Sequence, residues 1–509
     1  MRHLPLPRRM SSVIASTAVL ALVAGAAAVA LTGTAASADS SGSSRAKNVI
    51  YLLGDGMGRT HVTAARERFV GLDGRLAMET LPAQGFVSTY AVEKLSGQPG
   101  AADFHPNAVT DSASAATAWS SGVKTYNAAL GIDAKGTVAP TLMELAKKAG
   151  YRTGNVSTAE ITDATPAGQM SHALARGCQG PVYSAAACQD LAITGTALPT
   201  SDVRVTPIAE QIARNGTADV ILGGGLGRFD AADETALTAQ GYQVLGSITS
   251  QKVATKTDLA AANGAKVFGL FNTGNLTVEK SKLDNPTSVQ AQEPTLPEMT
   301  TKAIALLTAK YKKEKGEKAS KGFYLQIEGA LIDKRSHAND AAQTLGEMKA
   351  FDDAVAVARD FAKKDGNTLV IVTADHECAG FNIIEKGTFT NAQAATPPAN
   401  ADSGNRANSS TPVRPSNAID PSRSTGIMNG AGSADAKNFA PATFRIPSDP
   451  ATVTDGSPEA GLWLTYLSGN HTGADVPIYA TGPGSDQLQG SVDNTDLFDI
   501  MGRALRITG

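Results

Sequence analysis

Asp375 and His376 are adjacent residues that could bind one metal ion together, because carboxylate oxygens and imidazole nitrogens are both ordinary zinc ligands. They follow the apolar run Thr368–Val372, whose unbroken aliphatic side chains are typical of a strand buried on both faces. In open α/β sheets, ligands bind beyond the carboxyl ends of the strands. The alternative is a surface turn, in which Asp375 caps a helix and His376, one of 7 histidines, is incidental.

A glycine-rich turn, Gly54–Gly58, follows the strand expected at Asn48–Leu53. Its G-x-G-x-G spacing differs from the G-x-G-x-x-G of dinucleotide-binding loops. Asp55, within this turn, fits better as a metal ligand, because the neighbouring glycines permit close approach of the backbone.

More acidic and imidazole side chains follow other expected strands. Glu328 comes directly after the strand expected at Phe323–Ile327. Asp333 and His337 lie four residues apart, so one helical turn or a tight loop can direct both toward one ion. His471 precedes the last expected strand by a short loop. Such clustering predicts a hydrolytic site that contains more than one metal ion.

Ser112 is the candidate nucleophile. It begins an Ala-rich helix expected at Ser112–Ser121, where backbone N–H groups and the helix dipole favour an anion. The alternative is that Asp111 or Ser112 only caps this helix. No G-x-S-x-G elbow surrounds Ser112, so a metal would have to lower the pKa of its hydroxyl.

Arg176 is the candidate for binding an anion. A helix expected at Pro166–Ala175, capped by Asp163 or Thr165, would carry His172 and Arg176 on one face. An arginine in such a place is commonly a solvated surface charge. If it points toward an anion, its planar guanidinium can hold two phosphate oxygens at once.

The elements that must position these residues alternate along the chain. Strand-like apolar runs followed by helical patterns predict an α/β fold with a largely parallel central sheet and helices on both faces. The expected strands are Asn48–Leu53, Gly154–Ser157, Ala218–Leu222, Phe323–Ile327, Thr368–Val372 and Val476–Ala480. The expected helices are Ser112–Ser121, Thr141–Lys148, Pro166–Ala175, Pro297–Lys310, Ala341–Lys363 and Asn494–Ala504.

A stretch from about 390 to 458 differs from the rest in composition. It is rich in Asn, Ser, Thr, Pro, Ala and Gly and has few large apolar residues, which predicts a low-complexity surface insertion. Because strand-like sequence resumes at Trp463–His471, the insertion interrupts one domain and does not separate two.

The N-terminal segment 1–38 has the features of a removable export signal. Arg8 and Arg9 precede an apolar stretch from Val13 to about Leu31, and Ala36-Ser37-Ala38 supplies a small-residue cleavage site. A membrane anchor is the alternative, since the apolar stretch is nearly long enough to span a bilayer. The paired arginines leave both the general and the twin-arginine export routes open. Either reading places residues 39–509 outside the cytoplasm.

Charge and hydropathy limit the partners. The formal net charge of −3 is modest for 509 residues and argues against nucleic acid as a dedicated partner. Beyond the N-terminal segment, no stretch is long and apolar enough to suggest a membrane span.

The chain has three cysteines. In an oxidising compartment, Cys178 and Cys188 close a short loop and are the expected disulfide pair. Cys378 remains, two residues after His376, and could be either a thiol beside a metal or a buried free cysteine.

Taken together, these segments resemble the bacterial alkaline phosphatase family. The match runs in the family's order through GDGMG at 54–58, VTDSASAATAWSSGVKTYN at 109–127, STAE at 157–160, DATP at 163–166, EGALIDK at 328–334, TADH at 373–376 and HTG at 471–473. It covers most of the chain after residue 38 except the region of about 390–458, and the segment around Ser112 is its most specific part.

The resemblance implies a secreted phosphomonoesterase with two zinc ions and one magnesium ion. One zinc would be bound by Asp333, His337 and His471. The other, which faces Ser112, would be bound by Asp55, Asp375 and His376. Asp55 would also reach the magnesium, together with Thr165 and Glu328.

The resemblance also implies a mechanism. One zinc would stabilise Ser112 as an alkoxide that attacks phosphorus and becomes phosphoserine, and the other would receive the leaving alkoxide and then activate water. Arg176 would hold the phosphate oxygens, while Asp163 and Lys334 would act through water. Small phosphate monoesters would be the substrates, and a homodimer is a possible assembly.

Two other functions remain open at this point. A phosphodiesterase of the same superfamily would share the metal ligands but often uses Thr where this chain has Ser112. A non-catalytic phosphate- or metal-binding protein would have no need of a serine at a helix start. A sulfatase is excluded, because no C-x-P-x-R or S-x-P-x-R segment surrounds Ser112 or any cysteine.

Overall fold

A computed structural model describes residues 45–310, 320–386, 442–457, 459–467 and 469–507, all of them within one compact unit, Ser43–Gly509. The expected export signal at 1–38 and most of the expected insertion at 390–458 lie outside the described residues. The C-terminal part of that stretch is described, and it contains the short buried strand β13, Ala442–Phe444.

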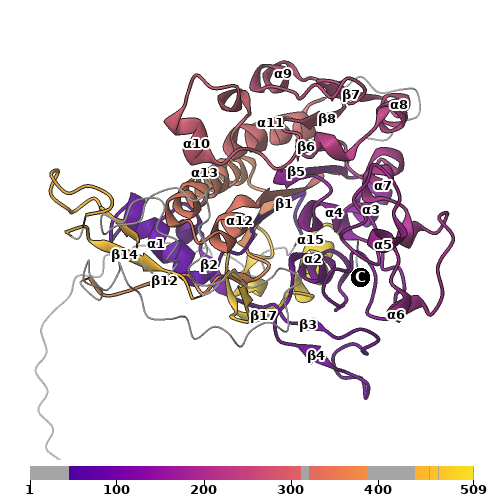
Figure 1. The fold of residues 1–509 in the computed structure, drawn as a ribbon, viewed down its shortest axis with the longest axis horizontal. Coiled ribbons are helices and arrows are strands. Elements are labelled where there is room, and N and C mark those ends of the chain that lie inside the picture. Colours follow the sequence, from indigo (N-terminus) through magenta and orange to yellow (C-terminus); the bar gives the residue numbers. More distant parts are fainter. Residues whose placement is uncertain (1–44, 311–319, 387–441, 458, 468, 508–509) are drawn as a thin grey trace, which may run out of the picture. The chain divides into compact units, whose positions relative to one another are not determined.

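The fold is built on a ten-stranded sheet with the order β17-β2-β16-β10-β1-β9-β5-β6-β8-β7 (Figure 1). Its strands are β1 Asn48–Gly54, β2 Ala83–Ser88, β5 Arg152–Glu160, β6 Val220–Gly224, β7 Tyr242–Leu245, β8 Lys266–Leu270, β9 Phe323–Gly329, β10 Thr368–Thr373, β16 Val476–Thr481 and β17 Gly490–Asp493. All six expected strands are present, and β2, β7, β8 and β17 were not expected from the sequence.

The sheet is largely parallel, as expected. From β10 through β1, β9, β5, β6 and β8 to β7, every neighbouring pair is parallel. Strand β16 pairs antiparallel with both β10 and β2, and β17 pairs parallel with β2, so β16 alone is reversed within this sheet. Nine strands therefore present their carboxyl ends toward one edge.

Helices cover both faces of this sheet. Every residue of β1, β9 and β10 is buried, which requires cover on both sides. Helices α11 and α13 pack against each other and on β9, while α3 and α4 contact β5 and β9 and also pack against α2 (Figure 1). The helices are α1 Arg59–Phe69, α2 Ser112–Ser121, α3 Leu142–Lys148, α4 Ala164–Ala167, α5 Ala185–Cys188, α6 Leu191–Thr194, α7 Ile208–Asn215, α8 Ala231–Ala239, α9 Lys256–Ala261, α10 Glu279–Asp284, α11 Leu296–Thr308, α12 Leu331–His337, α13 Ala341–Asp365 and α15 Asp496–Ala504.

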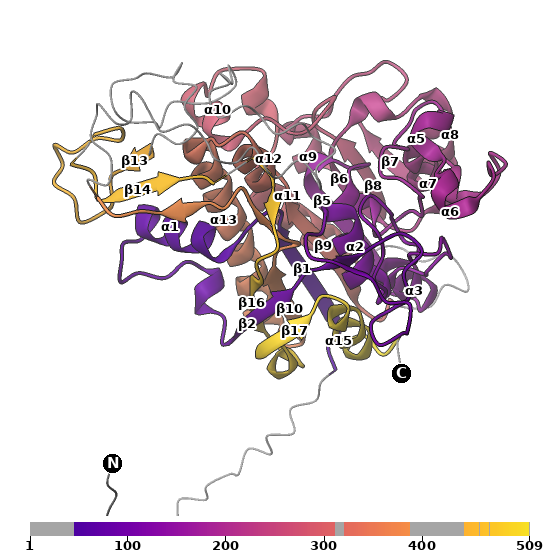
Figure 2. The same ribbon diagram turned by 60° about the horizontal axis from the view of Figure 1, so that its bottom comes forward.

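Three small sheets lie outside the central one. Strands β11, Glu377–Cys378, and β15, His471–Thr472, pair antiparallel. Strands β12, Asn382–Ile383, β14, Leu462–Thr465, and β13 form a three-stranded sheet whose members β12 and β14 contact α1. Figure 2 shows β14 beside α1, although about 400 residues separate them in the chain. The third is the pair β3, Ala91–Val92, and β4, Pro106–Asn107.

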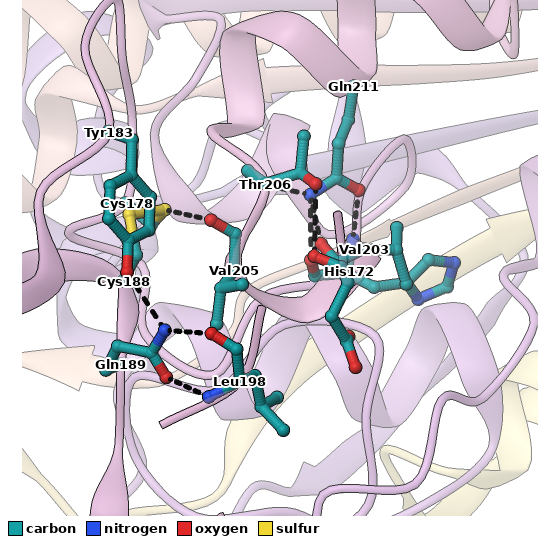
Figure 3. Close-up of a disulfide and its surroundings, with 11 residues drawn as sticks. His172, Cys178, Tyr183, Cys188, Gln189, Leu198, Val203, Val205, Thr206 and Gln211 are labelled. Atoms are coloured by element: carbon teal, nitrogen blue, oxygen red, sulfur yellow. Dashed lines mark hydrogen bonds between the residues drawn. A yellow bond between two sulfur atoms is a disulfide. The ribbon is translucent and has the colours of Figure 1, made fainter. Parts of the chain in front are cut away.

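The prediction of a helix at Pro166–Ala175 is wrong beyond the first turn. Asp163 caps α4 as expected, but α4 ends at Ala167. Instead of continuing the helix, Ala173 forms a β-bridge with Leu130. His172 and Arg176 therefore do not share a helical face. The main-chain N–H of His172 donates to Gln211 Oε1 at 2.9 Å, and its carbonyl accepts from Gln211 Nε2 (Figure 3).

Cys178 and Cys188 form the expected disulfide, in a loop where Gln189 bridges Tyr183 and Leu198 (Figure 3). Cys378 is free and buried. Within the described part of the chain, no helix combines the length and hydropathy that a bilayer crossing requires.

Candidate active site

Four neighbouring strands bring the expected site residues to one edge of the sheet. In the parallel pairing, Leu53 of β1 lies beside Glu328 of β9 and Thr373 of β10, and Ser157 of β5 lies on the other side of Glu328. The turn after β1 and the loop after β10 therefore start side by side. Asp55 lies in the first and Asp375 in the second.

A close backbone approach orders these two loops. The N–H of Gly56 donates to Asp375 Oδ1 at 3.0 Å, and the N–H of His376 donates to the same oxygen at 3.0 Å. Gly56 has a φ of +70°, and a Cβ at this position would lie 2.9 Å from the side chain of Asp333. Only glycine fits such a contact, so Gly56 lets the turn that carries Asp55 pack directly against Asp333.

Asp333, His337 and His471 meet at one point. The first two lie on α12, and His337 Nε2 is 3.1 Å from Asp333 Oδ2. His471, on β15, places its Nε2 at 3.1 Å from His337 Nε2 and 3.6 Å from Asp333 Oδ1. The other ring nitrogens face main-chain carbonyls, His337 Nδ1 at Gly469 and His471 Nδ1 at Thr110. This leaves both Nε2 atoms directed into the cluster.

Asp55, Asp375 and His376 form a second group beside Ser112. His376 Nε2 lies 3.1 Å from Asp375 Oδ2, 3.7 Å from Asp55 Oδ1 and 3.3 Å from Ser112 Oγ. Ser112 is the first residue of α2 and is buried. Its hydroxyl therefore lies at a helix N-terminus and beside the second group of ligands.

The donor sets of both groups fit metal cations. Asp55 Oδ1 and Asp333 Oδ1 are buried and have no hydrogen-bond partner among the described residues. Burial and the charges of Asp375 and Asp333 hold the pKa of Asp55 well above its usual range. A cluster of buried carboxylates around imidazoles is costly without a cation, so these residues fit zinc-like ions.

Glu328 and Thr165 form a neighbouring oxygen-rich position. Ser157 Oγ donates to Glu328 Oε2, and the Thr165 side chain lies against the same carboxyl. Burial raises the pKa of Glu328 to about 8, although the hydrogen bond from the Ser157 hydroxyl acts to lower this pKa. Carboxylate and hydroxyl oxygens are ligands that magnesium prefers.

Arg176 is held between two carboxylates. Its Nη1 donates to Asp111 Oδ2 at 3.2 Å and its Nη2 to Asp163 Oδ1 at 2.7 Å. Lys334 Nζ donates to Asp163 Oδ2 at 2.7 Å. Burial opposes ionisation of Asp163, but Lys334 and Arg176 outweigh it and hold the pKa of Asp163 well below its usual range. Arg176 is therefore a fixed cation, and the carboxylates Asp111 and Asp163 set its orientation.

Asp111, expected only as a helix cap, has a second role. One carboxylate oxygen does cap α2, accepting from Ser114 N at 2.9 Å. The other accepts from Arg176 and from the N–H of Ala128, whose carbonyl in turn accepts from Arg176 N at 2.7 Å. No local pattern signals this role, because Arg176 is 65 residues away.

His61 was also missed. It is fully buried between α1 and α12: Gly58 N donates to its Nδ1 at 3.2 Å, and its Nε2 lies 3.0 Å from Ser336 Oγ. Burial lowers its pKa to about 3, so it is neutral. It links the turn that carries Asp55 to the helix that carries Asp333. The sequence did offer one signal for His61, which is its position directly after the Gly-rich turn, in the first turn of a helix.

An α/β sheet whose carboxyl edge carries paired metal-ligand groups, a serine at a helix start and a fixed arginine is typical of metal-dependent phosphoryl hydrolases. The comparisons with known proteins identify the family. Residues 46–507 match the family model described as Alkaline phosphatase. The chain belongs to the alkaline phosphatase family, a family of phosphomonoesterases.

The relatives support this assignment over most of the chain. An alkaline phosphatase of Escherichia fergusonii is 37% identical, over 90% of this chain and 86% of its own. An alkaline phosphatase of Escherichia coli is 42% identical over 67% of this chain and 72% of its own. Streptomycin-6-phosphate phosphatase of Streptomyces griseus is 34% identical over 98% of both chains.

Solved structures support the fold. The cold-active alkaline phosphatase of Shewanella sp. has a TM-score of 0.60 at 26% identity and covers 90% of this chain and 99% of its own. The alkaline phosphatase of Thermus thermophilus has a TM-score of 0.62, at 24% identity, over 91% of this chain and 92% of its own.

Proposed function

We propose that this protein is a metal-dependent phosphomonoesterase that transfers the phosphoryl group of small monoesters to Ser112 and then to water. The observation that carries the proposal is the position of Ser112 Oγ, 3.3 Å from His376 Nε2 at the N-terminus of a buried helix. Two groups of proposed metal ligands with buried carboxylates, together with a fixed arginine, lie around it. A non-catalytic phosphate-binding protein would need no nucleophile at this point.

The ligand sets follow from the two clusters. We assign one zinc to Asp333, His337 and His471 and the other to Asp55, Asp375 and His376. We assign magnesium to Asp55, Thr165 and Glu328. When bound, the metals supply Lewis acidity, which lowers the pKa of coordinated hydroxyl groups and of water and offsets negative charge on phosphate oxygens.

The protein's own residues supply position and charge. Ser112 attacks phosphorus and carries the phosphoryl group as phosphoserine until water displaces it. Ser112 begins α2, and the N-terminus of a helix favours the negative charge of the phosphate oxygens. Arg176, held by Asp111 and Asp163, offers its planar guanidinium to two of these oxygens. An oxygen of a diester would carry a carbon substituent there, so this contact favours monoesters.

Replacing the nucleophile tests the proposal. Ser112→Ala should lower kcat for a phosphate monoester by at least about 10³-fold, because the two-step pathway is lost. Ser121→Ala, at the other end of the same helix and hydrogen-bonded to the Ala139 carbonyl, should keep nearly full activity. Turnover of a monoester and of a diester is measured for both variants. In the protein that keeps Ser112, mass spectrometry locates phosphate on the peptide that contains this residue. Full monoesterase activity in Ser112→Ala would refute the mechanism, and a preference for the diester would favour a phosphodiesterase.

We also propose that the protein is exported and that residues 1–38 are removed. The support is the arrangement of charged, apolar and small residues in this segment and the disulfide between Cys178 and Cys188, which persists in oxidising compartments. N-terminal sequencing of protein collected outside the cells should find Asp39 first. Recovery of the intact N-terminus from the membrane fraction would instead indicate an anchor.

A further inference from the structure

Cys378 lies on the same face of a short ribbon as two proposed metal ligands. In the antiparallel pair of β11 and β15, Cys378 is directly opposite His471, and opposite residues point their side chains to the same face. His376 precedes Cys378 by two residues, so alternation along an extended chain directs both to that face. Glu377 and Thr472, the other cross-strand pair, line a separate cavity of about 550 Å³.

The thiol lies within reach of an ion in the first cluster. Cys378 Sγ and one ligand atom each of Asp333, His337 and His471 all lie within 4.8 Å of one another. Two ligands of a tetrahedral zinc with bonds of ~2.0 Å to nitrogen and ~2.3 Å to sulfur lie roughly 3.5 Å apart. Closing the group around one ion therefore requires movements on the order of 1 Å.

A second observation points to a ligand at the same place. Asp333 Oδ1 is buried and has no hydrogen-bond partner among the described residues. The Cys378 thiol, a weak donor, lies 3.8 Å from the Asp333 carbonyl oxygen. One carboxylate, two imidazoles and one thiol form a complete set of four zinc ligands.

We propose that Cys378 is a fourth protein ligand of the metal ion bound by Asp333, His337 and His471. The inference rests on the proposed function, which places a metal there. On ligation the thiol loses its proton to solvent and the thiolate sulfur forms the bond to the metal. Because zinc also accepts five ligands, four protein ligands would still leave a position for phosphate or water. A sulfur ligand would also make this site softer than the neighbouring site, whose proposed ligands are all oxygen and nitrogen atoms. Co²⁺ bound there would show a charge-transfer band that depends on the sulfur.

Cobalt spectroscopy of the whole protein tests the proposal. Metal-free protein is reloaded with Co²⁺, and visible d–d bands and the near-ultraviolet sulfur-to-cobalt charge-transfer band are recorded for wild type, Cys378→Ser and Cys378→Ala. Cys178 and Cys188 are joined in a disulfide, so Cys378 is the chain's one source of a thiolate. We expect the charge-transfer band in wild type and its loss in both variants, while d–d bands persist in all three.

The outcomes separate the two proposals. If wild type shows d–d bands without the charge-transfer band, Cys378 is not a ligand and the metal site stands. If Co²⁺ gives no d–d bands in wild type, the metal site of the proposed function fails and the sulfur ligand fails with it. Ser112→Ala is the companion control: it should lose monoesterase activity and keep the charge-transfer band, which shows that the band reports ligation and not turnover.

Discussion

Arg176 shows how single side chains at this site depend on partners that are distant in the chain. Its guanidinium is shared by Asp111, from the start of α2, and Asp163, from the cap of α4. Lys334 of α12 neutralises the second oxygen of Asp163. The side chain of Arg176 is 29% exposed, so its guanidinium, held by two carboxylates, is still partly open to a ligand.

Arg176→Ala should lower kcat/KM for a monoester by about 10²–10³-fold, because a positioned donor to the transferring phosphoryl group is lost. Arg176→Lys should lower kcat/KM by less, because lysine keeps the positive charge but lacks the planar guanidinium that binds two oxygens at once. Steady-state kinetics and the inhibition constant of inorganic phosphate check both. Arg204→Lys, in a half-exposed pair with Asp202, is the matched control and should behave as wild type. Unchanged phosphate inhibition in Arg176→Ala would contradict the assignment of this residue.

Cys378 is a second residue whose side-chain orientation depends on a distant part of the chain. Its position two residues after His376 suggested either a thiol near a metal or a buried free cysteine. The structure shows that it is both buried and within the cluster of proposed ligands. Only the pairing of β11 with β15 decides which way the side chain points.

At the scale of elements, α13 is the long helix that supports the strands carrying the site. It packs on β1, β9 and β10 and contacts α12 and α10. Its contact with α10 buries carboxyl groups: Glu347 accepts from the N–H of Glu279 at 2.7 Å, and Lys282 pairs with Glu279 at 2.6 Å. Burial and the charge of Glu279 raise the pKa of Glu347 to about 8.

This contact predicts a pH dependence of stability. The folded protein keeps the Glu347 proton up to about pH 8, whereas the unfolded chain releases it near 4.5, so stability falls as the pH rises through this window. Glu347→Gln keeps a side-chain oxygen that can accept the hydrogen bond but removes the titratable carboxyl group. It should therefore raise the free energy of unfolding at pH 9 by roughly 1–4 kcal/mol. Urea unfolding at pH 5 and pH 9 measures the difference, which should be small at pH 5.

Asp353→Asn is the matched control for that experiment. Asp353 lies on the same helix in a half-exposed pair with Lys349, and surface pairs contribute little. It should change the unfolding free energy little at either pH. An equal effect of Glu347→Gln at pH 5 and pH 9 would show that ionisation of Glu347 is not the cause.

At the scale of the whole molecule, the site joins segments that the chain separates by hundreds of residues. Ser112 and His376 are 264 residues apart, and His471 and Thr110 are 361 apart. Metal ions bound at this junction would connect β1, β9, β10, α12 and β15. Without them, the carboxylates of Asp55, Asp333 and Asp375 lie close together in a buried place.

Chelation should therefore lower both activity and stability. Ligands that bind only the folded state at 100-fold above their dissociation constant stabilise it by about 2.7 kcal/mol each. We expect loss of monoesterase activity and a clear fall in Tm after treatment with a chelator, with recovery of both on adding Zn²⁺ and Mg²⁺. Calorimetry and activity on the same samples check this. A fully active protein without metal, by elemental analysis, would refute the proposed function.

Much of the architecture was predictable from local patterns. The buried strands β1, β9 and β10 were recognisable because a strand covered on both faces must be apolar throughout. Strands β2 and β17 were missed because they lie near the edge of the sheet and carry exposed or polar residues. Pro166 suggested a helix start correctly, but nothing in its vicinity showed that tertiary contacts would stop the helix at Ala167.

The candidate site residues, their order and their places after strands were recognisable from the sequence alone. This was possible because strand periodicity, helix caps and short ligand spacings are local properties. Only the tertiary structure decided that Asp111 orients Arg176, that His61 joins α1 to α12, and that Cys378 faces the proposed metal. These contacts join segments that meet only after strand pairing and helix packing, so no local pattern encodes them.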